Sequence, residues 1–384
     1  MERIDYLLTI NSEHYGLLEM KGFTNMLKDP SYCYKFYWLE AIVKLIGRNV
    51  TETTMGDIID EMIVNAWYSV VEYHIHLSGL VKGEVRDGLE RAVNKLKAVS
   101  DLTSGSSSEE IRNAIRIHAK ELNTERRQLT NMVPYRALSG FFDNHNVTVN
   151  WEKSSDVIES ARLLDLNTVK LPYVFGDGCS LKRKIIFNPD WIKMIACNSS
   201  EILGWIQYEK LKWLQNNNPE VPGLVYKLEQ NGGVRNLDKA RKLWNAIFKL
   251  AEIRDIYTGN PIDPKGYEMD HFVPWSFVMN DELWNLMPMD PSLNSTKSNN
   301  LPNWDSFFKG FADNQFRMYT MINEYEGIHS LFESCYRDNL RSIWAQQDLY
   351  KKGNTREDFT GVLSKNMRPV YDSALRQGYS LWRF

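Results

Sequence analysis

The residues best suited to chemistry lie between positions 267 and 302. Asp270 and His271 are neighbours at the end of a short run that predicts a strand, just before Pro274. Because neighbouring side chains on a strand point to opposite faces, one of the pair can hold an ion while the other addresses a water molecule. At the end of a strand, both can still reach one site. A neutral histidine, with an unperturbed pKa of about 6.5, is suited to take a proton from water near neutral pH.

A second strand and a helix are predicted directly after this pair. The apolar run 283–289 is typical of a strand, and Asp290-Pro291 predicts a helix start, with aspartate as the N-cap and proline at the first helical position. Asn294 then lies one turn into the helix, and Lys297, three residues later, lies on the same side. The predicted order is strand, loop, strand and helix, with polar residues at the junctions.

This order of elements resembles the HNH endonuclease family, whose core is the ββα-metal fold. The resemblance covers about residues 253–308. Three blocks carry it in family order and spacing: Asp-His-Phe-Val-Pro-Trp-Ser at 270–276, Leu-Trp-Asn-Leu at 283–286 and Asn-Ser-Thr-Lys-Ser-Asn-Asn-Leu-Pro at 294–302. The upstream Tyr-Thr-Gly at 257–259 resembles the family's lead-in, where a cysteine often sits near the tyrosine. Asp255 and Ile256 occupy that place here, which excludes the zinc-knuckle version of the family.

The resemblance implies a role for each matching residue. His271 matches the general base, and Asp270 matches the metal ligand that precedes it. Asn285 matches the central asparagine, which in the family pins the loop and helps to orient the base. Asn294 stands in the place of the final histidine, and in the branch of the family with asparagine there, the side-chain oxygen ligates the metal. Because carboxylate and amide oxygens are hard donors, we expect Mg²⁺ or Mn²⁺ rather than Zn²⁺.

The resemblance also implies hydrolysis of a phosphodiester. His271 would take a proton from water, and the ion held by Asp270 and Asn294 would bridge the scissile phosphate and the leaving 3′ oxygen. The implied products are a 5′-phosphate and a 3′-hydroxyl. Lys297 is predicted to contact a flanking phosphate.

Basic residues just before the motif predict a surface that contacts nucleic acid. Arg235 precedes a predicted helix on which Lys239, Lys242 and Lys249 form a basic face. A solvated helix face is the alternative, because charge runs usually face water. The formal net charge of the chain is -3, so contact with a polyanion requires a local basic patch of this kind.

The length and composition favour a soluble globular protein. The chain has 384 residues, which predicts two or three domains, with 43% hydrophobic and 25% charged residues. No apolar stretch approaches the roughly 18 residues that cross a bilayer, and the N-terminus does not have the pattern of a secretory signal. The four cysteines, at 33, 179, 197 and 335, form no CxxC pair, so we expect reduced thiols in a cytoplasmic protein without a membrane partner.

The fold class that we expect is mainly α, with a small α+β ββα-metal nuclease core near the C-terminus. We predict a helical N-terminal region at 1–105, a mixed but mainly helical targeting or regulatory region at 106–250, the HNH core at 251–310 and a helical C-terminal extension at 311–384. The first boundary lies at the serine-rich run 104–108. Apolar residues at helical spacing over 55–71 and 240–251 predict two of the helices.

Three functions are consistent with these observations. The first is a DNA endonuclease, in restriction or phage defence, with double-stranded DNA as its partner. The second is a nuclease for RNA or a hybrid duplex that uses the same site. The third is a non-cleaving DNA-binding subunit of a larger complex. Besides nucleic acid, we consider two possible protein partners: a second copy of the chain, in a homodimer, or a partner protein of a defence system.

Overall fold

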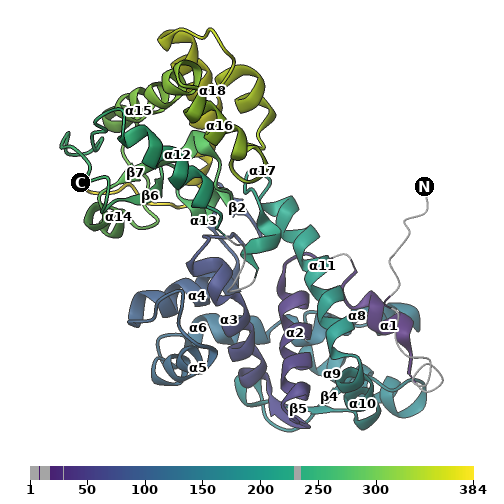
Figure 1. The fold of residues 1–384 in the computed structure, drawn as a ribbon. Helices are drawn as coiled ribbons and strands as arrows, with labels where there is room; N and C mark the ends of the chain where they lie inside the picture. Colours follow the sequence, from purple (N-terminus) through teal and green to yellow (C-terminus); the bar gives the residue numbers. More distant parts are fainter. Residues whose placement is uncertain (1–7, 9–17, 29, 229–234) are drawn as a thin grey trace. The chain divides into compact units, whose positions relative to one another are not determined.

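The structure is a computed structural model that describes residues 8, 18–28, 30–228 and 235–384. The chain divides into two compact units, one with residues 1–219 and 227–230, the other with residues 220–226 and 231–384 (Figure 1). Both are mainly helical, which confirms the predicted fold class. The predicted division at 105, 250 and 310 is finer than these two units and stays a prediction.

The first unit consists of helices and two small antiparallel sheets. Its helices are α1 (Met20–Asn25), α2 (Tyr34–Gly47), α3 (Met55–Val71), α4 (Gly88–Val99), α5 (Ser108–Ile117), α6 (Asn123–Thr130), α7 (Val133–Arg136), α8 (Ser139–Asn144), α9 (Ser154–Asn167), α10 (Pro189–Cys197) and α11 (Ser199–Asn217). One sheet has the strand order β1 (Glu52–Thr54), β5 (Lys184–Phe187), β4 (Tyr173–Phe175), and the other pairs β2 (Leu80–Val81) with β3 (Glu84–Val85).

Helices α2 and α3 run side by side in the first unit and supply much of its core (Figure 1). Both bury large aromatic residues, including Trp38 and Trp67. Helix α3 begins where the sequence predicts, because Thr54 forms a capping box with Asp57. Helices α3 and α5, which lie before and after the serine run, pack together, and Nε1 of Trp67 in α3 donates a hydrogen bond of 2.9 Å to the carbonyl oxygen of Thr103.

The second unit contains the predicted strand, loop, strand and helix, but the second strand begins at Leu286, because residues 283–285, which we expected in it, form a 3₁₀-helix. Its strands are β6 (Glu268–His271) and β7 (Leu286–Met289), which pair in antiparallel register. Its helices are α12 (Asp238–Phe248), α13 (Trp275–Val278), the 3₁₀-helix η4 (Leu283–Asn285), α14 (Pro291–Lys297), α15 (Trp304–Glu324), α16 (Glu326–Ser334), α17 (Tyr336–Asn339), the π-helix η5 (Ala345–Leu349) and α18 (Arg356–Arg376).

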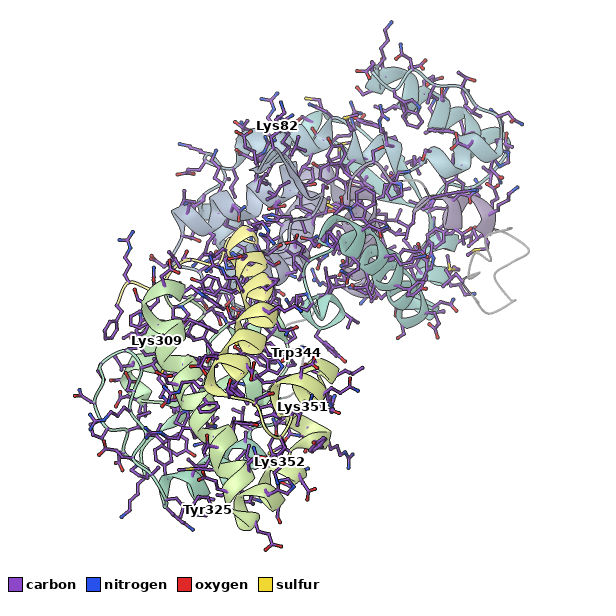
Figure 2. The ribbon with its side chains drawn as sticks, turned by 90° about the horizontal axis from the view of Figure 1, so that it is seen from above. Lys82, Lys309, Tyr325, Trp344, Lys351 and Lys352 are labelled. Carbon is purple, nitrogen blue, oxygen red and sulfur yellow. The ribbon has the colours of Figure 1, made fainter. Side chains whose placement is uncertain are left out.

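An aromatic cluster anchors the end of β6 to the helices around it. Phe272, the residue after the strand, contacts Trp304, Phe308 and Phe311 of α15. The rings of Trp304 and Phe308, one helical turn apart, stack with centroids 4.0 Å apart. On a separate part of the unit, Trp344 (labelled in Figure 2) packs against the ring of Trp284, with centroids 5.3 Å apart. These contacts fix both ends of the segment between β6 and β7.

The sequence analysis also made predictions about the cysteines and about membrane-spanning segments. The four cysteines all lie in the described part of the chain and form no disulfide; Cys33 and Cys335 are buried. Among the described residues, no helix has both the length and the apolar character that are needed to cross a membrane.

Candidate active site

The candidate catalytic pair, Asp270 and His271, forms the last two residues of β6. Helix α14 follows β7 after Asp290, whose carboxylate accepts hydrogen bonds from backbone N–H groups of the first turn. Pro291 occupies the first helical position, where a missing N–H costs nothing. Local capping therefore fixes where α14 begins, as the sequence predicts, and in the structure the helix packs against β6.

His271 is 2% exposed and its ring lies among polar groups from two other segments. Nη2 of Arg235 lies 3.1 Å from Nδ1. Nε2 lies 3.1 Å from the carbonyl oxygen of Asn280 and 3.0 Å from Oδ1 of Asp281. Because a guanidinium only donates and a carbonyl only accepts, this network assigns the proton to Nε2 and the lone pair to Nδ1. The atom of His271 that can accept a proton is therefore Nδ1.

The protonation states around His271 suit a general base. Burial lowers the pKa of His271 below its ordinary value of 6.5, which outweighs the opposing effect of Asp281. The ring is therefore neutral at neutral pH. Burial acts to raise the pKa of Asp281, but hydrogen bonds to His271 and to the backbone N–H of Asn236 hold it below the ordinary 3.8, so Asp281 is a carboxylate. A carboxylate beside Nε2 stabilises the positive charge that arises when Nδ1 takes a proton.

The C-terminal part of the chain holds the loop that carries Asp281. Nδ2 of Asn339, at the end of α17, donates a hydrogen bond of 2.8 Å to the carbonyl oxygen of Asp281. Glu282, the next residue in the loop, accepts hydrogen bonds from the backbone N–H groups of Arg341, at 2.8 Å, and Ser342, at 3.1 Å. Residues 339–342 therefore fix the position of the carboxylate that faces the histidine.

Asn285 is fully buried and joins the two sides of the turn that follows β6. Its Oδ1 accepts from the backbone N–H of Val273, and its Nδ2 donates to the carbonyl oxygen of the same residue, both at 2.8 Å. Its own carbonyl oxygen accepts from the N–H of Phe272 at 2.9 Å. This two-way bond suits a residue that pins the loop beside the base. Its contribution to catalysis stays a prediction.

The carboxylate of Asp270 forms a buried ion pair with α14. Nζ of Lys297 lies 3.2 Å from Oδ1 and 3.1 Å from Oδ2 of Asp270, and it also donates to the carbonyl oxygen of His271 at 2.8 Å. Lys297 is fully buried and Asp270 is 6% exposed. We expected Lys297 to contact a flanking phosphate. In the structure its ammonium neutralises Asp270, so a phosphate contact would require it to leave this pair.

Asn294 lies one turn into α14, at the position that the capping pattern predicts. Its Nδ2 donates a hydrogen bond of 2.6 Å to Oε2 of Glu268. Glu268 and Asp270 are two residues apart on β6, so their side chains lie on the same face of the strand. Asn294 and Lys297, three residues apart, lie on one face of the helix. Four polar side chains therefore meet between β6 and α14.

The oxygen donors between β6 and α14 fit a hard divalent cation. Oδ2 of Asp270 is buried and makes no hydrogen bond with the described residues, although an ammonium lies near it. Asn294 offers its amide oxygen, because its amide nitrogen is engaged by Glu268. The described residues include no cluster of three or more His, Cys, Asp or Glu side chains that could hold a metal. Asp270 and Asn294 are the residues here that could hold such a cation, through their side-chain oxygens.

The basic residues expected to form one surface have different environments. Arg235 contacts His271 and has its guanidinium 5.7 Å from the centre of the Trp275 ring. Lys239 pairs with Asp338 at 2.7 Å. Lys242 and Lys249, both on or directly after α12, are exposed and have no ion pair with a described residue. The structure brings Arg235 to the candidate base and leaves two of the three lysines facing solvent.

Sequence reasoning missed three residues that shape the site. Asp281 contacts the base, Glu268 binds Asn294, and Asn339 holds the loop of Asp281. A signal was present for Glu268, because it lies two residues before Asp270 and strand alternation places both on one face. The sequence carried no comparable signal for Asn339, which reaches the site from 58 residues beyond Asp281.

A family model of HNH endonucleases matches residues 255–303. The match includes β6, β7 and α14, and with them Asp270, His271, Asn285 and Asn294. No curated protein and no solved structure matches the chain. The segment near the C-terminus is thus an HNH endonuclease domain, which supports a nuclease in general. The match leaves the first unit outside it.

Proposed function

We propose that this chain, through its HNH endonuclease domain at residues 255–303, is a metal-dependent endonuclease that hydrolyses phosphodiester bonds in DNA. The observation that supports this most strongly is the environment of His271, a buried neutral ring with an accepting Nδ1 and with Asp281 beside Nε2. Oxygen donors for a cation lie on the neighbouring residue, Asp270, and on Asn294. A base for water beside oxygen ligands for a cation is what hydrolysis of a phosphodiester requires.

The proposed reaction is a single displacement at phosphorus. Nδ1 of His271 takes a proton from a water molecule while the water oxygen bonds to phosphorus and the bond from phosphorus to the 3′ oxygen breaks. The carbonyl oxygen of Asn280 accepts Nε2–H, and the carboxylate of Asp281, 3.0 Å from Nε2, stabilises the imidazolium. Asp270 and Asn294 would hold Mg²⁺ or Mn²⁺, which supplies charge stabilisation at the phosphate and at the leaving oxygen. The leaving 3′ oxygen takes a proton from solvent water, and the products are a 5′-phosphate and a 3′-hydroxyl.

Arg235 has a place in this mechanism that the sequence did not suggest. Its guanidinium donates to Nδ1 of His271, the atom that must accept the proton. Arginine also binds phosphate oxygens strongly, often through two parallel hydrogen bonds. We expect an incoming phosphate to draw the guanidinium away from Nδ1, so that the lone pair becomes available to water when substrate is bound.

Replacement of Arg235 by alanine is therefore expected to slow single-turnover cleavage by about 10²-fold, the usual cost of removing one donor at the reacting group. The cleavage rate of Arg235→Lys should lie between the rates of the wild type and of Arg235→Ala, because lysine keeps the positive charge but lacks the planar guanidinium. Arg356→Ala is a suitable control, since Arg356 is also exposed and pairs with Asp313 elsewhere in the unit. Faster cleavage by Arg235→Ala would mean that the guanidinium only blocks the base.

The exposed lysines near α12 test the proposed contact with the DNA backbone. Reversal of both charges, in Lys242→Glu/Lys249→Glu, should weaken DNA binding and lower the salt slope of the affinity by about one for each phosphate that the protein no longer binds. The matched control is Lys351→Glu/Lys352→Glu, which reverses two exposed charges elsewhere in the same unit (Figure 2). If both pairs leave affinity and salt slope unchanged, the lysines of α12 form a solvated face.

The proposed activity is tested with purified full-length protein and supercoiled plasmid, in Mg²⁺, in Mn²⁺ and in EDTA. Nicked plasmid in either metal and intact plasmid in EDTA are expected. A parallel panel of duplex DNA, RNA and hybrid duplex identifies the preferred substrate, with DNA expected to be cleaved fastest. Failure to cleave any of these in Mg²⁺ or Mn²⁺ would favour a non-cleaving DNA-binding subunit. Full activity in EDTA would remove the metal from the proposal.

Two further parts of the proposal concern assembly and biological setting. One active site per chain cuts one strand at a time, so a double-strand break requires a second copy of the chain or a second event. We propose restriction or phage defence as the setting, with the first unit in targeting, regulation or partner binding. Lower plaque numbers in cells that express the wild-type chain, but not His271→Ala, are the expected result.

A further inference from the structure

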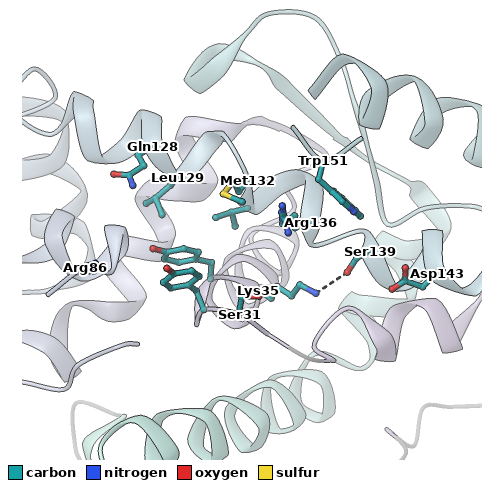
Figure 3. Close-up of a pocket in the computed structure, with 13 residues that line it drawn as sticks. Ser31, Lys35, Arg86, Gln128, Leu129, Met132, Arg136, Ser139, Asp143 and Trp151 are labelled. Carbon is teal, nitrogen blue, oxygen red and sulfur yellow. Dashed lines mark hydrogen bonds between the residues drawn. The ribbon is translucent and has the colours of Figure 1, made fainter. Parts of the chain in front are cut away.

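The first unit contains a cavity of about 570 Å³ that the nuclease proposal does not use. We propose that this cavity binds a nucleotide, with its base stacked on Tyr32 and Tyr34 and its phosphate held by Arg136 and Lys35. Its lining comes from the segment that leads into α2, from the ends of α6, α7 and α8, and from residues just before α4 and α9 (Figure 3). The volume lies within the range of about 300–1,000 Å³ that is usual for small-molecule sites.

One wall of the cavity offers a flat aromatic surface. The rings of Tyr32 and Tyr34 stack with centroids 5.2 Å apart and an interplanar angle of 11°. The hydroxyl oxygen of Tyr34 accepts a hydrogen bond of 2.7 Å from the backbone N–H of Gly88, at the start of α4, which holds the pair in place. Tyr32 is 47% exposed, so its ring is accessible to a ligand. A preformed stacked pair with an accessible ring is a platform for a planar base.

The opposite side of the cavity carries positive charge. The guanidinium of Arg136 lies 5.5 Å from the centre of the Trp151 ring, and its Nε is buried without a hydrogen-bond partner among the described residues. Lys35 extends toward Ser139, to which its Nζ donates at 2.9 Å (Figure 3). Arg86 is the third cation in the lining. An arginine held by an aromatic face is suited to bind a phosphate or carboxylate with its planar guanidinium.

The combination of these two walls favours a nucleotide over a simple anion or an apolar molecule. Three cationic side chains and one carboxylate, Asp143, line the cavity, so an anionic ligand is favoured. The stacked tyrosines add no affinity for inorganic phosphate but add stacking energy for a base. A ligand with a flat ring and a phosphate uses both walls at once.

Two sources can supply such a nucleotide. It can be a free nucleotide, or it can be one unstacked nucleotide of a nucleic-acid strand. The chemistry of recognition is shared, because both present a base and a phosphate. The proposal does not rest on nuclease activity, since it concerns residues 31–151 of the first unit and is measured by binding alone.

The test is isothermal titration calorimetry with the full chain in EDTA, so that no cleavage occurs. The free probes are AMP, GMP, ATP and GTP, with adenosine and inorganic phosphate as the two halves of the ligand. A ten-nucleotide single-stranded DNA is the strand probe. We expect saturable binding of at least one nucleotide, about tenfold or more tighter than either adenosine or phosphate, because stacking and ion pairing each contribute at least that factor. Binding of the oligonucleotide alone would assign the strand as the source.

Variants then tie the binding to the cavity. Tyr32→Ala and Arg136→Gln should each weaken it by about tenfold or more. Tyr208→Ala and Arg162→Gln are matched controls from the same unit: Tyr208 is 46% exposed, and Arg162 is exposed and pairs with Glu159. Thermal melting checks the fold of each variant. If Arg136→Gln does not fold, Lys35→Met replaces it.

Three results would overturn the proposal. The first is no saturable binding of any nucleotide or of the oligonucleotide. The second is equal affinity for inorganic phosphate and for nucleotides, which would make the cavity a plain anion site. The third is nucleotide or oligonucleotide binding that folded Tyr32 and Arg136 variants retain at full strength, which would place the ligand elsewhere on the chain.

Discussion

Replacement of His271 by alanine is expected to slow plasmid nicking by about 10²–10⁴-fold, the usual contribution of a general base. The loss is expected because Nδ1 of His271 is the atom that takes the proton from water. In the structure Nδ1 accepts a hydrogen bond, while Nε2 carries the proton. Binding of DNA should change little, since the buried ring contributes little surface for substrate. Single-turnover nicking at saturating protein, together with a binding measurement, separates the two effects.

Two controls distinguish loss of the base from loss of the fold. His329→Ala removes a histidine of the same unit that is exposed and lies beside Glu333, so it should nick at the wild-type rate. Added imidazole should restore part of the activity of His271→Ala, because a small base can enter the space that the ring leaves. Nicking by His271→Ala at nearly the wild-type rate would show that another group takes the proton.

Local signals in the sequence were sufficient to predict the ββα element. The Asp290-Pro291 pair predicted the start of α14, and the structure places the N-cap and the first helical residue there. The spacing of apolar residues over 55–71 likewise predicted α3, and in the structure Thr54 and Asp57 cap its start. These predictions succeed because a cap acts over three or four residues, so its energetic effect is contained in a short stretch of sequence.

Pairings between distant residues could not be predicted from such signals. Lys297 lies on the face of α14 that the spacing indicates, but its partner is Asp270, 27 residues earlier. Arg235 was expected on a basic surface, and its guanidinium instead reaches a histidine 36 residues away. In each case the residue type indicated a charged contact, but the sequence did not indicate which residue is contacted. A long side chain can reach several groups around one backbone position.

The cavity of the first unit also could not be predicted from the sequence, because it brings together residues from many separate segments. Its lining runs from Ser31 to Trp151 and involves many elements, none of which contains more than a few of the residues. No motif links Tyr32 to Arg136 in the sequence. Their proximity depends on how α2 packs against α7, which follows from the burial of apolar faces and not from any local pattern.

The pair of Asp270 and Lys297 leads to the second large effect that we expect. Asp270→Asn leaves a fully buried ammonium without its carboxylate, and removal of one partner of a buried pair typically costs about 3–5 kcal/mol. The unfolding free energy of Asp270→Asn should therefore fall by about this amount. Asp270→Asn/Lys297→Met removes the second charge with a side chain of similar size and should recover most of that stability. Urea denaturation measures both, with Asp305→Asn, at a 92% exposed carboxylate, as the control.

The double variant is decisive because it separates stability from chemistry. If Asp270 holds the cation, Asp270→Asn/Lys297→Met is stable and still nicks plasmid at least about 10²-fold more slowly, since the charged ligand is gone. Lys297→Met alone keeps the carboxylate and removes its ammonium partner, so Mg²⁺ should raise its melting temperature more than that of the wild type. Recovery of nicking together with stability in the double variant would show that Asp270 serves only to neutralise Lys297. In that case the cation would bind elsewhere in the domain.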